Sequence, residues 1–340
     1  MRRFDVCLVA SADEAVRSLS ERPGASDKRA DSAAVVLAGG TTLIDLMKLQ
    51  VMNPTVLVEM GDADARLGGV EVGTQGLTMG ARARMAEVAD HPAVRRDYPV
   101  VAEALSKAAS QQLRNMATMA GNLLQRTRCA YFRDTSWKRC NKRDPGSGCD
   151  ALDGSNREHA ILGVSDQCIA NYAGDFAHVF VALDGHVDVL GPAGSREIRA
   201  ADLHLSSGES SSIETTLRPG EVITALHIPA GPWTRRSTYL KVRDRESYQF
   251  AVASAAVALH IKDDVVREAR VGLGGTTGKP WRSHEAEDEL RGRSMSELVA
   301  NRAASAAFAG AQLRLHNAVK KPLGEQTLVR ALLHAAAMDV

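Results

Sequence analysis

Four of the five cysteines in this chain are grouped, and thiolates are strong ligands for iron and zinc. Cys129, Cys140, Cys149 and Cys168 fall close together in the sequence, whereas Cys7 stands alone. The start of the chain lacks the apolar segment of an export signal, so the thiols are expected to stay reduced. This grouping favours a metal centre over disulfides, and Cys7 is expected to be a small buried residue on the first strand.

The segment that carries these cysteines has little regular pattern. From residue 125 to 171 polar and basic residues dominate, and so long a loop in a compact domain needs something besides an apolar core to organise it. Spacing alone leaves both an iron–sulfur cluster and zinc open, although zinc sites usually contain cysteine pairs two to four residues apart, which this segment lacks. Neighbouring basic side chains are expected to lower the thiol pKa values; they are Arg126, Arg128, Arg133, Lys138, Arg139, Lys142 and Arg143.

Two segments rich in small residues have the composition of phosphate-binding loops. One is GGTT at residues 39–42, after an expected strand, and the other is RNMATMAGNL at residues 114–123, after an expected helix. Glycine lets backbone N–H groups approach a diphosphate, and a threonine hydroxyl adds a further donor. Taken alone, the first is better explained as a turn and the second as a helix C-cap. The first segment lacks the spacing of the dinucleotide fingerprint and the lysine of the P-loop.

Periodicity predicts the elements that would position these loops. Apolar runs rich in β-branched residues predict strands over 34–38, 55–60 and 222–228, and a hairpin over 69–73 and 77–80. A second hairpin is expected over 177–183 and 186–190, joined by Asp184-Gly185. A helical pattern covers 92–110.

A break rich in proline and glycine at 229–232 separates a region of different character. Strands are expected over 239–243, 251–261 and 265–273, followed by helices over 283–315 and 325–337. The acidic run from Glu285 to Glu289 is expected to face solvent. The ten histidines show no metal-ligand spacing, so no role is assigned to them.

Composition excludes several classes of function. The chain has 340 residues with a formal net charge of +1, so no global field favours a polyanion, and nucleic acid is not an expected partner. No apolar run approaches the roughly 20 residues that span a bilayer. The length favours two domains, or one domain with a large appendage.

The ordered set of motifs resembles a known family. The GGTT and RNMATMAGNL loops, Tyr239-Leu240-Lys241, and Gly274-Gly275 with Pro280 and Arg282 are similar to the flavin subunit of the xanthine dehydrogenase and carbon monoxide dehydrogenase family. The resemblance implies an α+β chain: a two-lobed FAD-binding domain of the vanillyl-alcohol oxidase type over 1–230, and a smaller C-terminal domain of sheet plus helices over 231–340.

The resemblance also implies a set of FAD-binding residues. The first loop and its strand would wrap the diphosphate of FAD, and the second loop would complete this binding site. Lys241 would approach the isoalloxazine ring, where a cation stabilises a reduced flavin. The implied set is Val36, Leu37, Ala38, Gly39, Gly40, Thr41, Thr42, Leu43, Thr118, Gly121, Asn122, Asp175, Ile223 and Lys241. Position 120 is alanine where the family usually has glycine, and position 42 is threonine where an acidic or amide residue is common.

The segment at about 125–171 resembles an insertion found in bacterial three-subunit aldehyde oxidoreductases, whose flavin subunit holds a 4Fe-4S cluster. By this resemblance the cluster ligands are Cys129, Cys140, Cys149 and Cys168. With the flavin motifs beside it, the iron–sulfur interpretation is favoured over zinc.

The implied function is electron transfer within a molybdenum-dependent aldehyde or xanthine-type oxidoreductase. Electrons would arrive from a molybdopterin large subunit through a 2Fe-2S small subunit, reduce FAD and leave to an external acceptor. Two alternative functions stay open: a self-contained flavin oxidase or reductase, and a non-catalytic assembly subunit that holds zinc. Without a signal of its own the chain is expected in the cytoplasm, or in the periplasm if a partner with a signal carries it there.

Overall fold

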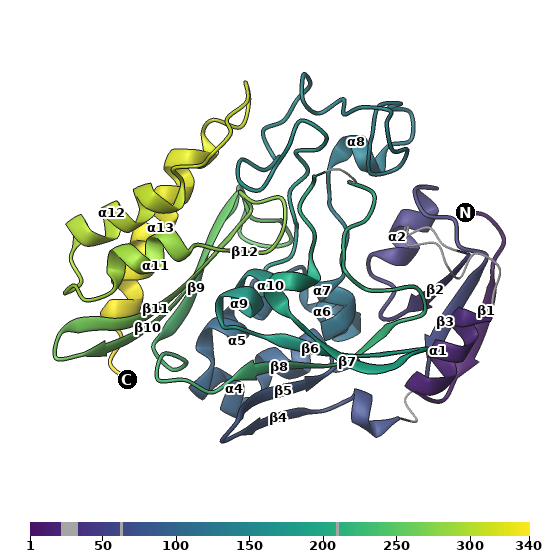
Figure 1. The fold of residues 1–340 in the computed structure, drawn as a ribbon, viewed down its shortest axis with the longest axis horizontal. Helices are drawn as coiled ribbons and strands as arrows, with labels where there is room; N and C mark the ends of the chain where they lie inside the picture. The colour runs from purple at the N-terminus through teal and green to yellow at the C-terminus, as the bar shows by residue number, and fades with distance from the viewer. Residues whose placement is uncertain (22–32, 62–63, 209–210) are drawn as a thin grey trace.

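A computed structural model describes residues 1–21, 33–61, 64–208 and 211–340. The N-terminal part is a parallel sheet of order β1-β3-β2, made of β1 (Asp5–Val9), β2 (Ala34–Leu37) and β3 (Val56–Met60). Helix α1 (Ala12–Ser20) packs on one face of this sheet, where Val9 of β1 is buried, while its neighbour Leu8 points to the other side and is exposed. Helix α2 (Leu43–Lys48) follows β2 at the edge of this sheet (Figure 1).

The central part is an antiparallel sheet of order β4-β5-β8-β6-β7. Its strands are β4 (Val70–Gly73), β5 (Gly76–Gly80), β6 (His186–Gly191), β7 (Gly194–Arg199) and β8 (Val222–Pro229). One face packs against helices, and the large core between them includes Val187, Leu226, Leu105 and Phe176. The helices are α3 (Met85–Asp90), α4 (Pro92–Asp97), α5 (Pro99–Ser106), α6 (Gln111–Met116), α7 (Met119–Leu123), α9 (Phe176–Ala182) and α10 (Ala200–Leu203); a 3-10 turn, η1, spans Ala65–Leu67.

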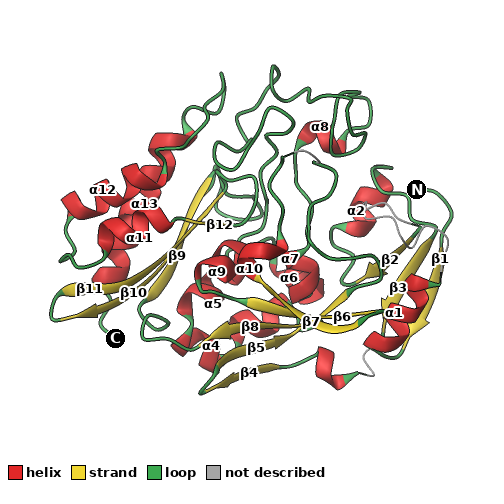
Figure 2. Cartoon of the chain, in the orientation of Figure 1, coloured by secondary structure: helices red, strands yellow, loops and turns green. Residues whose placement is uncertain are grey.

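The C-terminal part is a second antiparallel sheet, of order β12-β11-β10-β9. Its strands are β9 (Ser237–Val242), β10 (Ala253–Lys262), β11 (Val265–Gly274) and β12 (Trp281–Arg282). The helices α11 (His284–Leu290), α12 (Glu297–Ala307) and α13 (Lys320–Ala336) cover one face (Figure 2). The opposite face contributes Tyr239 and Ala256 to the central core, so the two sheets share a packed boundary.

An irregular segment connects α7 to α9 and lies at the top of Figure 1. Helix α8 (Ala130–Arg133) is the one helix assigned between residues 125 and 175, all of which are described. The segment has its own small core, in which Phe132 and Ile169 pack with the cysteines. This agrees with the predicted lack of periodicity over 125–171.

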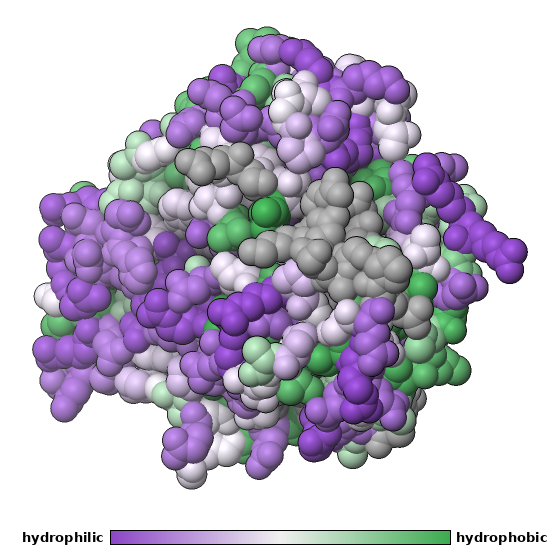
Figure 3. All heavy atoms as spheres, turned by 45° about the vertical axis from the view of Figure 1, so that its right-hand side comes forward, coloured by the Kyte–Doolittle hydropathy of each residue, from purple (hydrophilic) through white to green (hydrophobic). Residues whose placement is uncertain are grey.

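Figure 3 shows hydrophilic residues over the left part of one face and more hydrophobic surface toward its right-hand part. In the described parts of the chain, no helix has the length and apolar character needed to cross a bilayer.

Most predicted strands are confirmed, but the expected hairpin over 177–183 and 186–190 is wrong. Residues Phe176–Ala182 form helix α9 and are buried on every side, so a continuous apolar run carried no period that could separate helix from strand. Asp184 has a φ of 56° and ends this helix rather than joining two strands. Strand β6 instead pairs with β7.

Two long helical patterns are each divided into two helices. The pattern over 92–110 contains α4 and α5, which meet at Tyr98 because Pro99 disfavours helical geometry in the residue before it. The pattern over 283–315 contains α11 and α12, separated by Gly292, whose φ is +78°. Helix α13 begins at Lys320, with Pro322 in its first turn.

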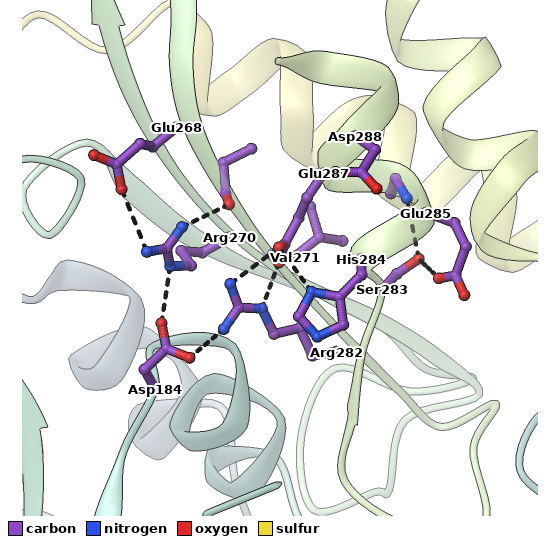
Figure 4. A network of polar contacts seen from close by, with 12 residues as sticks. Asp184, Glu268, Arg270, Val271, Arg282, Ser283, His284, Glu285, Glu287 and Asp288 are labelled. Atoms are coloured by element: carbon purple, nitrogen blue, oxygen red, sulfur yellow. Dashed lines mark hydrogen bonds and ion pairs between the residues drawn. The ribbon is translucent and has the colours of Figure 1, made fainter.

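The acidic run of α11 is not wholly solvated, which corrects the expectation for 285–289. Glu287 is buried, and its Oε1 accepts hydrogen bonds from Arg282 Nε at 2.7 Å and from the Val271 backbone N–H at 2.9 Å (Figure 4). Arg282 also contacts Asp184, which follows α9. The network therefore ties the C-terminal part to the helix layer of the central part.

Candidate functional site

A cavity of about 380 Å³ lies where the N-terminal sheet, the central sheet and the irregular segment meet. Its volume is within the range of small-molecule and cofactor pockets. The loop between β2 and α2, the start of α7 and the connection between α10 and β8 supply most of the lining. Predicted FAD-binding residues that line it are Val36, Ala38, Gly39, Gly40, Thr41, Thr42, Leu43, Thr118, Gly121 and Ile223.

The two glycine-containing loops lie against each other at this cavity. A Cβ built on Gly39 would come within 2.0 Å of the Met116 carbonyl oxygen, and one built on Gly121 would come within 3.2 Å of Ala38 Cβ. Gly40 has a φ of 71°, a conformation that side chains other than glycine rarely adopt. The chain therefore needs glycine at these positions to keep two backbone segments close together and free of side chains.

The second loop contains the helix C-cap that its sequence predicts and also begins a further helix: α6 ends at Met116 with Ala117 as its C-cap, and α7 follows directly. Thr118 is the N-cap of α7, and its Oγ1 accepts a hydrogen bond from Gly121 N at 3.1 Å. Within the described structure, the buried side-chain oxygen Oδ1 of Asn122 has no hydrogen-bond partner, although Asn122 is not among the lining residues. A buried unsatisfied amide oxygen fits a site where a bound group supplies the missing donor.

Four predicted residues are not among those that line the cavity: Leu37, Asn122, Asp175 and Lys241. Lys241 Nζ lies 2.8 Å from Asp175 Oδ2 and donates to the Lys107 carbonyl oxygen at 3.1 Å, and its side chain is 1% exposed. The Tyr239 hydroxyl donates to Asp175 Oδ1 at 2.6 Å. Burial and the Asp175 charge raise the pKa of Tyr239 well above its usual value. Sequence separation hides this pairing, but the structure brings Asp175 and Lys241 together.

The four grouped cysteines also come together in one buried cluster. Cys140 and Cys149 face each other in an antiparallel bridge, Cys168 pairs with Ser165, and all four are free thiols that share the core of the irregular segment. Three of them are buried and Cys149 is partly exposed. By contrast, Cys7 on β1 is half-buried and remote in sequence, with its sulfur 3.8 Å from Ser18 Oγ.

The spacing of the sulfurs bears on which metal would fit. Within the described residues, no three cysteine sulfurs lie within 4.8 Å of one another. Four thiolates around one zinc ion at ~2.3 Å would be only ~3.8 Å apart. In a 4Fe-4S cluster each iron atom takes one cysteine, so its four thiolates lie farther apart than those around one zinc ion. Four free thiols gathered in one small core are a donor set that an iron–sulfur cluster accepts.

The predicted lowering of the thiol pKa values is wrong for this protein without bound metal. Burial raises the pKa of Cys129 to about 12 and also raises the pKa values of Cys149 and Cys168. The neighbouring cations are held by other partners: Arg128 and Arg133 pair with Asp45. Their charge is thereby compensated, so desolvation dominates.

Comparison with known proteins identifies the chain. The model of the FAD binding domain in molybdopterin dehydrogenase matches residues 2–231, and that of the CO dehydrogenase flavoprotein C-terminal domain matches residues 238–335. The chain belongs to the FAD-binding medium subunits of the CO dehydrogenase and xanthine oxidase family. Members of this family are subunits of molybdenum-containing oxidoreductases. The alternative function of a self-contained flavin oxidase or reductase is therefore not favoured.

Individual relatives agree with this family. The aldehyde oxidoreductase FAD-binding subunit PaoB of Escherichia coli is 42% identical over 339 residues, which cover 99% of each chain. The carbon monoxide dehydrogenase medium chain of Afipia carboxidovorans is 26% identical, covering 80% of this chain and 77% of that one. Among solved structures, carbon monoxide dehydrogenase from Hydrogenophaga pseudoflava matches with a TM-score of 0.75 at 23% identity, covering 99% and 98% of the two chains. The last comparison shows the fold alone.

In this family member the cavity and the cysteine cluster share a wall. Glu214 lines the cavity and accepts hydrogen bonds from Arg126 Nε and Lys142 Nζ, each at 2.7 Å. Burial opposes ionisation of Glu214, but the two cations outweigh it and lower its pKa to about 2. Ser207 also lines the cavity and hydrogen-bonds the Cys168 thiol. Sequence reasoning gave Glu214 and Ser207 no role, because their partners come from the distant irregular segment.

Proposed function

We propose that this chain is the FAD- and 4Fe-4S-containing electron-transfer subunit of a molybdenum-dependent aldehyde, or xanthine-type, oxidoreductase. The observation that carries the proposal is the meeting of two glycine loops at a cavity that shares a wall with four buried cysteines. Family membership supports the flavin, and the full-length similarity to an aldehyde oxidoreductase subunit supports the substrate class. Bound FAD would supply the ability to accept electrons and pass them on.

The cavity residues would hold FAD as follows. The loop of Gly39 and Gly40 and the start of α7 would face the diphosphate, because only bare backbone fits between them. Asn122 Oδ1 would gain the partner that it lacks in the described structure. Ile223 would pack against the cofactor from β8. Asp175 and Lys241 would act on the cofactor as a buried ion pair whose opposite charges compensate each other, and not as a free cation.

This assignment carries two structural proposals. The FAD-binding domain would span 1–230 and have the two-lobed arrangement of vanillyl-alcohol oxidase, and the C-terminal domain would span 231–340. The three-stranded and five-stranded sheets on either side of the cavity support two lobes.

The cysteine cluster would hold the 4Fe-4S centre through Cys129, Cys140, Cys149 and Cys168. The presence of four thiol donors in one cluster, the absence of disulfides among these four and the enclosing apolar core support this proposal. Binding of iron would deprotonate thiols whose pKa values are high without metal, so assembly releases protons.

Partners complete the proposed activity. A 2Fe-2S small subunit and a molybdenum large subunit would deliver electrons, and an external acceptor would remove them, in a heterotrimer or a dimer of heterotrimers. The complex would work in the cytoplasm, or in the periplasm if a partner carries it there.

Anaerobic purification of the complex with its natural partners tests both cofactors. We expect a flavin absorption spectrum, one FAD per chain, and four iron atoms per chain beyond those of the small subunit. Cys140→Ser should lose this iron, whereas the matched control Cys7→Ser should keep it. A preparation of intact complex with zinc in place of this iron, or without flavin, would contradict the proposal.

A further inference from the structure

Two histidines and an aspartate meet on the outer face of the central sheet. His186 and Asp188 lie two residues apart on β6, so both point to the same side, and His227 on β8 is paired in register with His186. The neighbouring residues on the same strands, Val187 and Leu226, are buried in the core. The three polar side chains therefore point to the opposite face of the sheet. None of the three lines the FAD cavity.

The donor atoms are close enough to share one ion. One ligand atom from each of His186, Asp188 and His227 lies within 4.8 Å of the other two. His227 Nε2 is 2.8 Å from Asp188 Oδ2, and the two imidazole rings are stacked with centroids 4.8 Å apart. Imidazole nitrogen with one carboxylate is a donor set typical of divalent transition metals such as zinc.

Neighbouring side chains could orient one imidazole ring and add negative charge beside the three donors, and both features favour a metal ion. Thr78 Oγ1 lies 3.1 Å from His227 Nδ1 and can fix that ring, leaving Nε2 to point toward Asp188. On the other side, Glu197 of β7 pairs in register with Asp188, and its Oε2 is 3.6 Å from His186 Nε2. Two carboxylates directly opposite on a sheet are destabilising unless a cation lies between them.

The three side chains are partly buried but remain accessible to solvent. Their exposed fractions are 30% for His186, 49% for Asp188 and 25% for His227, so an ion can enter from solvent. An open pocket lined in part by Thr78, Glu71 and both histidines adjoins the donors and leaves room for water at the remaining coordination positions.

We infer that His186, Asp188 and His227 form a binding site for one divalent transition-metal ion of the zinc class, separate from the FAD cavity and the cysteine cluster. The ion would join β6 to β8, and β8 also supplies Ile223 to the wall of the FAD cavity. Occupancy would therefore stabilise the sheet on which the cavity is built. The inference does not depend on the proposed function.

Calorimetric titration with zinc alone, on the complete complex carrying its cofactors, tests the site. Wild-type protein and the matched control His316→Ala, whose side chain is exposed elsewhere, should bind one equivalent with the same affinity. His186→Ala and His227→Gln should bind it at least tenfold more weakly. Zinc held by empty cysteines would be the same in all four proteins, so that signal is separable.

Two further measurements keep the result independent of folding. Thr78→Val retains every ligand and should weaken zinc by roughly 10- to 100-fold, the usual effect of losing an orienting partner. Zinc should raise the melting temperature of the wild type but not that of His186→Ala. Equal zinc affinity in wild type and both histidine variants, or no zinc binding by the wild type, would overturn the inference.

Discussion

His159 Nε2 lies 3.1 Å from Cys129 Sγ, and both side chains are buried. The sulfur is therefore the hydrogen-bond partner of Nε2, and in the described structure Nδ1 is among the buried atoms without a side-chain hydrogen bond. Burial, aided by the charge of Lys320, lowers the pKa of His159 to about 4. A neutral imidazole with its proton on Nε2 would donate to a metal-bound thiolate.

The first prediction concerns the reduction potential of the proposed 4Fe-4S centre. A hydrogen bond to a cysteine sulfur stabilises the more negative, reduced cluster, so His159→Leu should lower the potential. Redox titration followed by electron paramagnetic resonance measures the change, and iron content shows whether the cluster assembled. His316→Ala serves as the control. An iron-loaded His159→Leu protein with an unchanged potential would show that the contact does not tune the cluster.

The second prediction concerns the approach of the two glycine loops. Gly39→Ala places a methyl group where the Met116 carbonyl oxygen lies, so the loops must separate at a cost of about 1–3 kcal/mol or more. We expect purified protein with much less FAD per chain, measured by flavin absorption after denaturation. Gly310→Ala is the matched control, because a Cβ there meets no atom within 4 Å. Full flavin content in Gly39→Ala would rule out this loop as a diphosphate cradle.

Local chemistry explains which parts of the fold were predictable. The β-branched runs bracketed by glycine and proline gave β2, β3 and β8 nearly to the residue, because short buried strands have a distinctive composition. Helix α9 was mistaken for a strand because all of its side chains are buried, which removes the amphipathic period. The bounds of that element were close, and only its type was wrong.

The candidate site also contains residues that the sequence predicts and residues that it does not. The glycine and cysteine positions carry their own signal, since few other residues serve in tight loops or as thiolate ligands. His159 lies 30 residues from Cys129, and Glu214 lies 88 residues from Arg126, so only the folded chain reveals these pairs. Glu287 looked like one of several surface carboxylates until β11 and β12 placed Val271 and Arg282 beside it.

The third prediction uses Glu287. Glu287→Gln leaves Arg282 with less charge compensation and weakens the bond to the Val271 backbone, so unfolding free energy should fall by about 1–3 kcal/mol. Urea unfolding of the isolated chain measures this. Glu285→Gln, on the exposed side of α11, should change stability by less than about 0.5 kcal/mol. Equal effects of the two substitutions would mean that the network in Figure 4 adds no stability.

The fourth prediction concerns Glu214 and pH. Because the folded pKa of about 2 lies below the unfolded value, ionised Glu214 stabilises the fold fully above about pH 4.5 and loses this contribution as pH falls toward 2. At pH 7, Glu214→Gln leaves Arg126 and Lys142 partly buried without their counter-charge, at a cost of about 3–5 kcal/mol.

Urea midpoints of the wild type and Glu214→Gln should therefore differ most above pH 5 and converge as the pH falls. The control is Glu221→Gln, which removes a different buried carboxylate, paired with Arg196 at 2.7 Å in the same connection. Both carboxylates line the cavity, so both substitutions lower stability and can weaken FAD retention. Only Glu214→Gln separates the irregular segment from the cavity wall, so only it should also expose the cysteines to thiol reagents. If thiol reactivity rises equally in both variants, Glu214 is a general stabiliser of the fold and does not specifically join the two proposed cofactor sites.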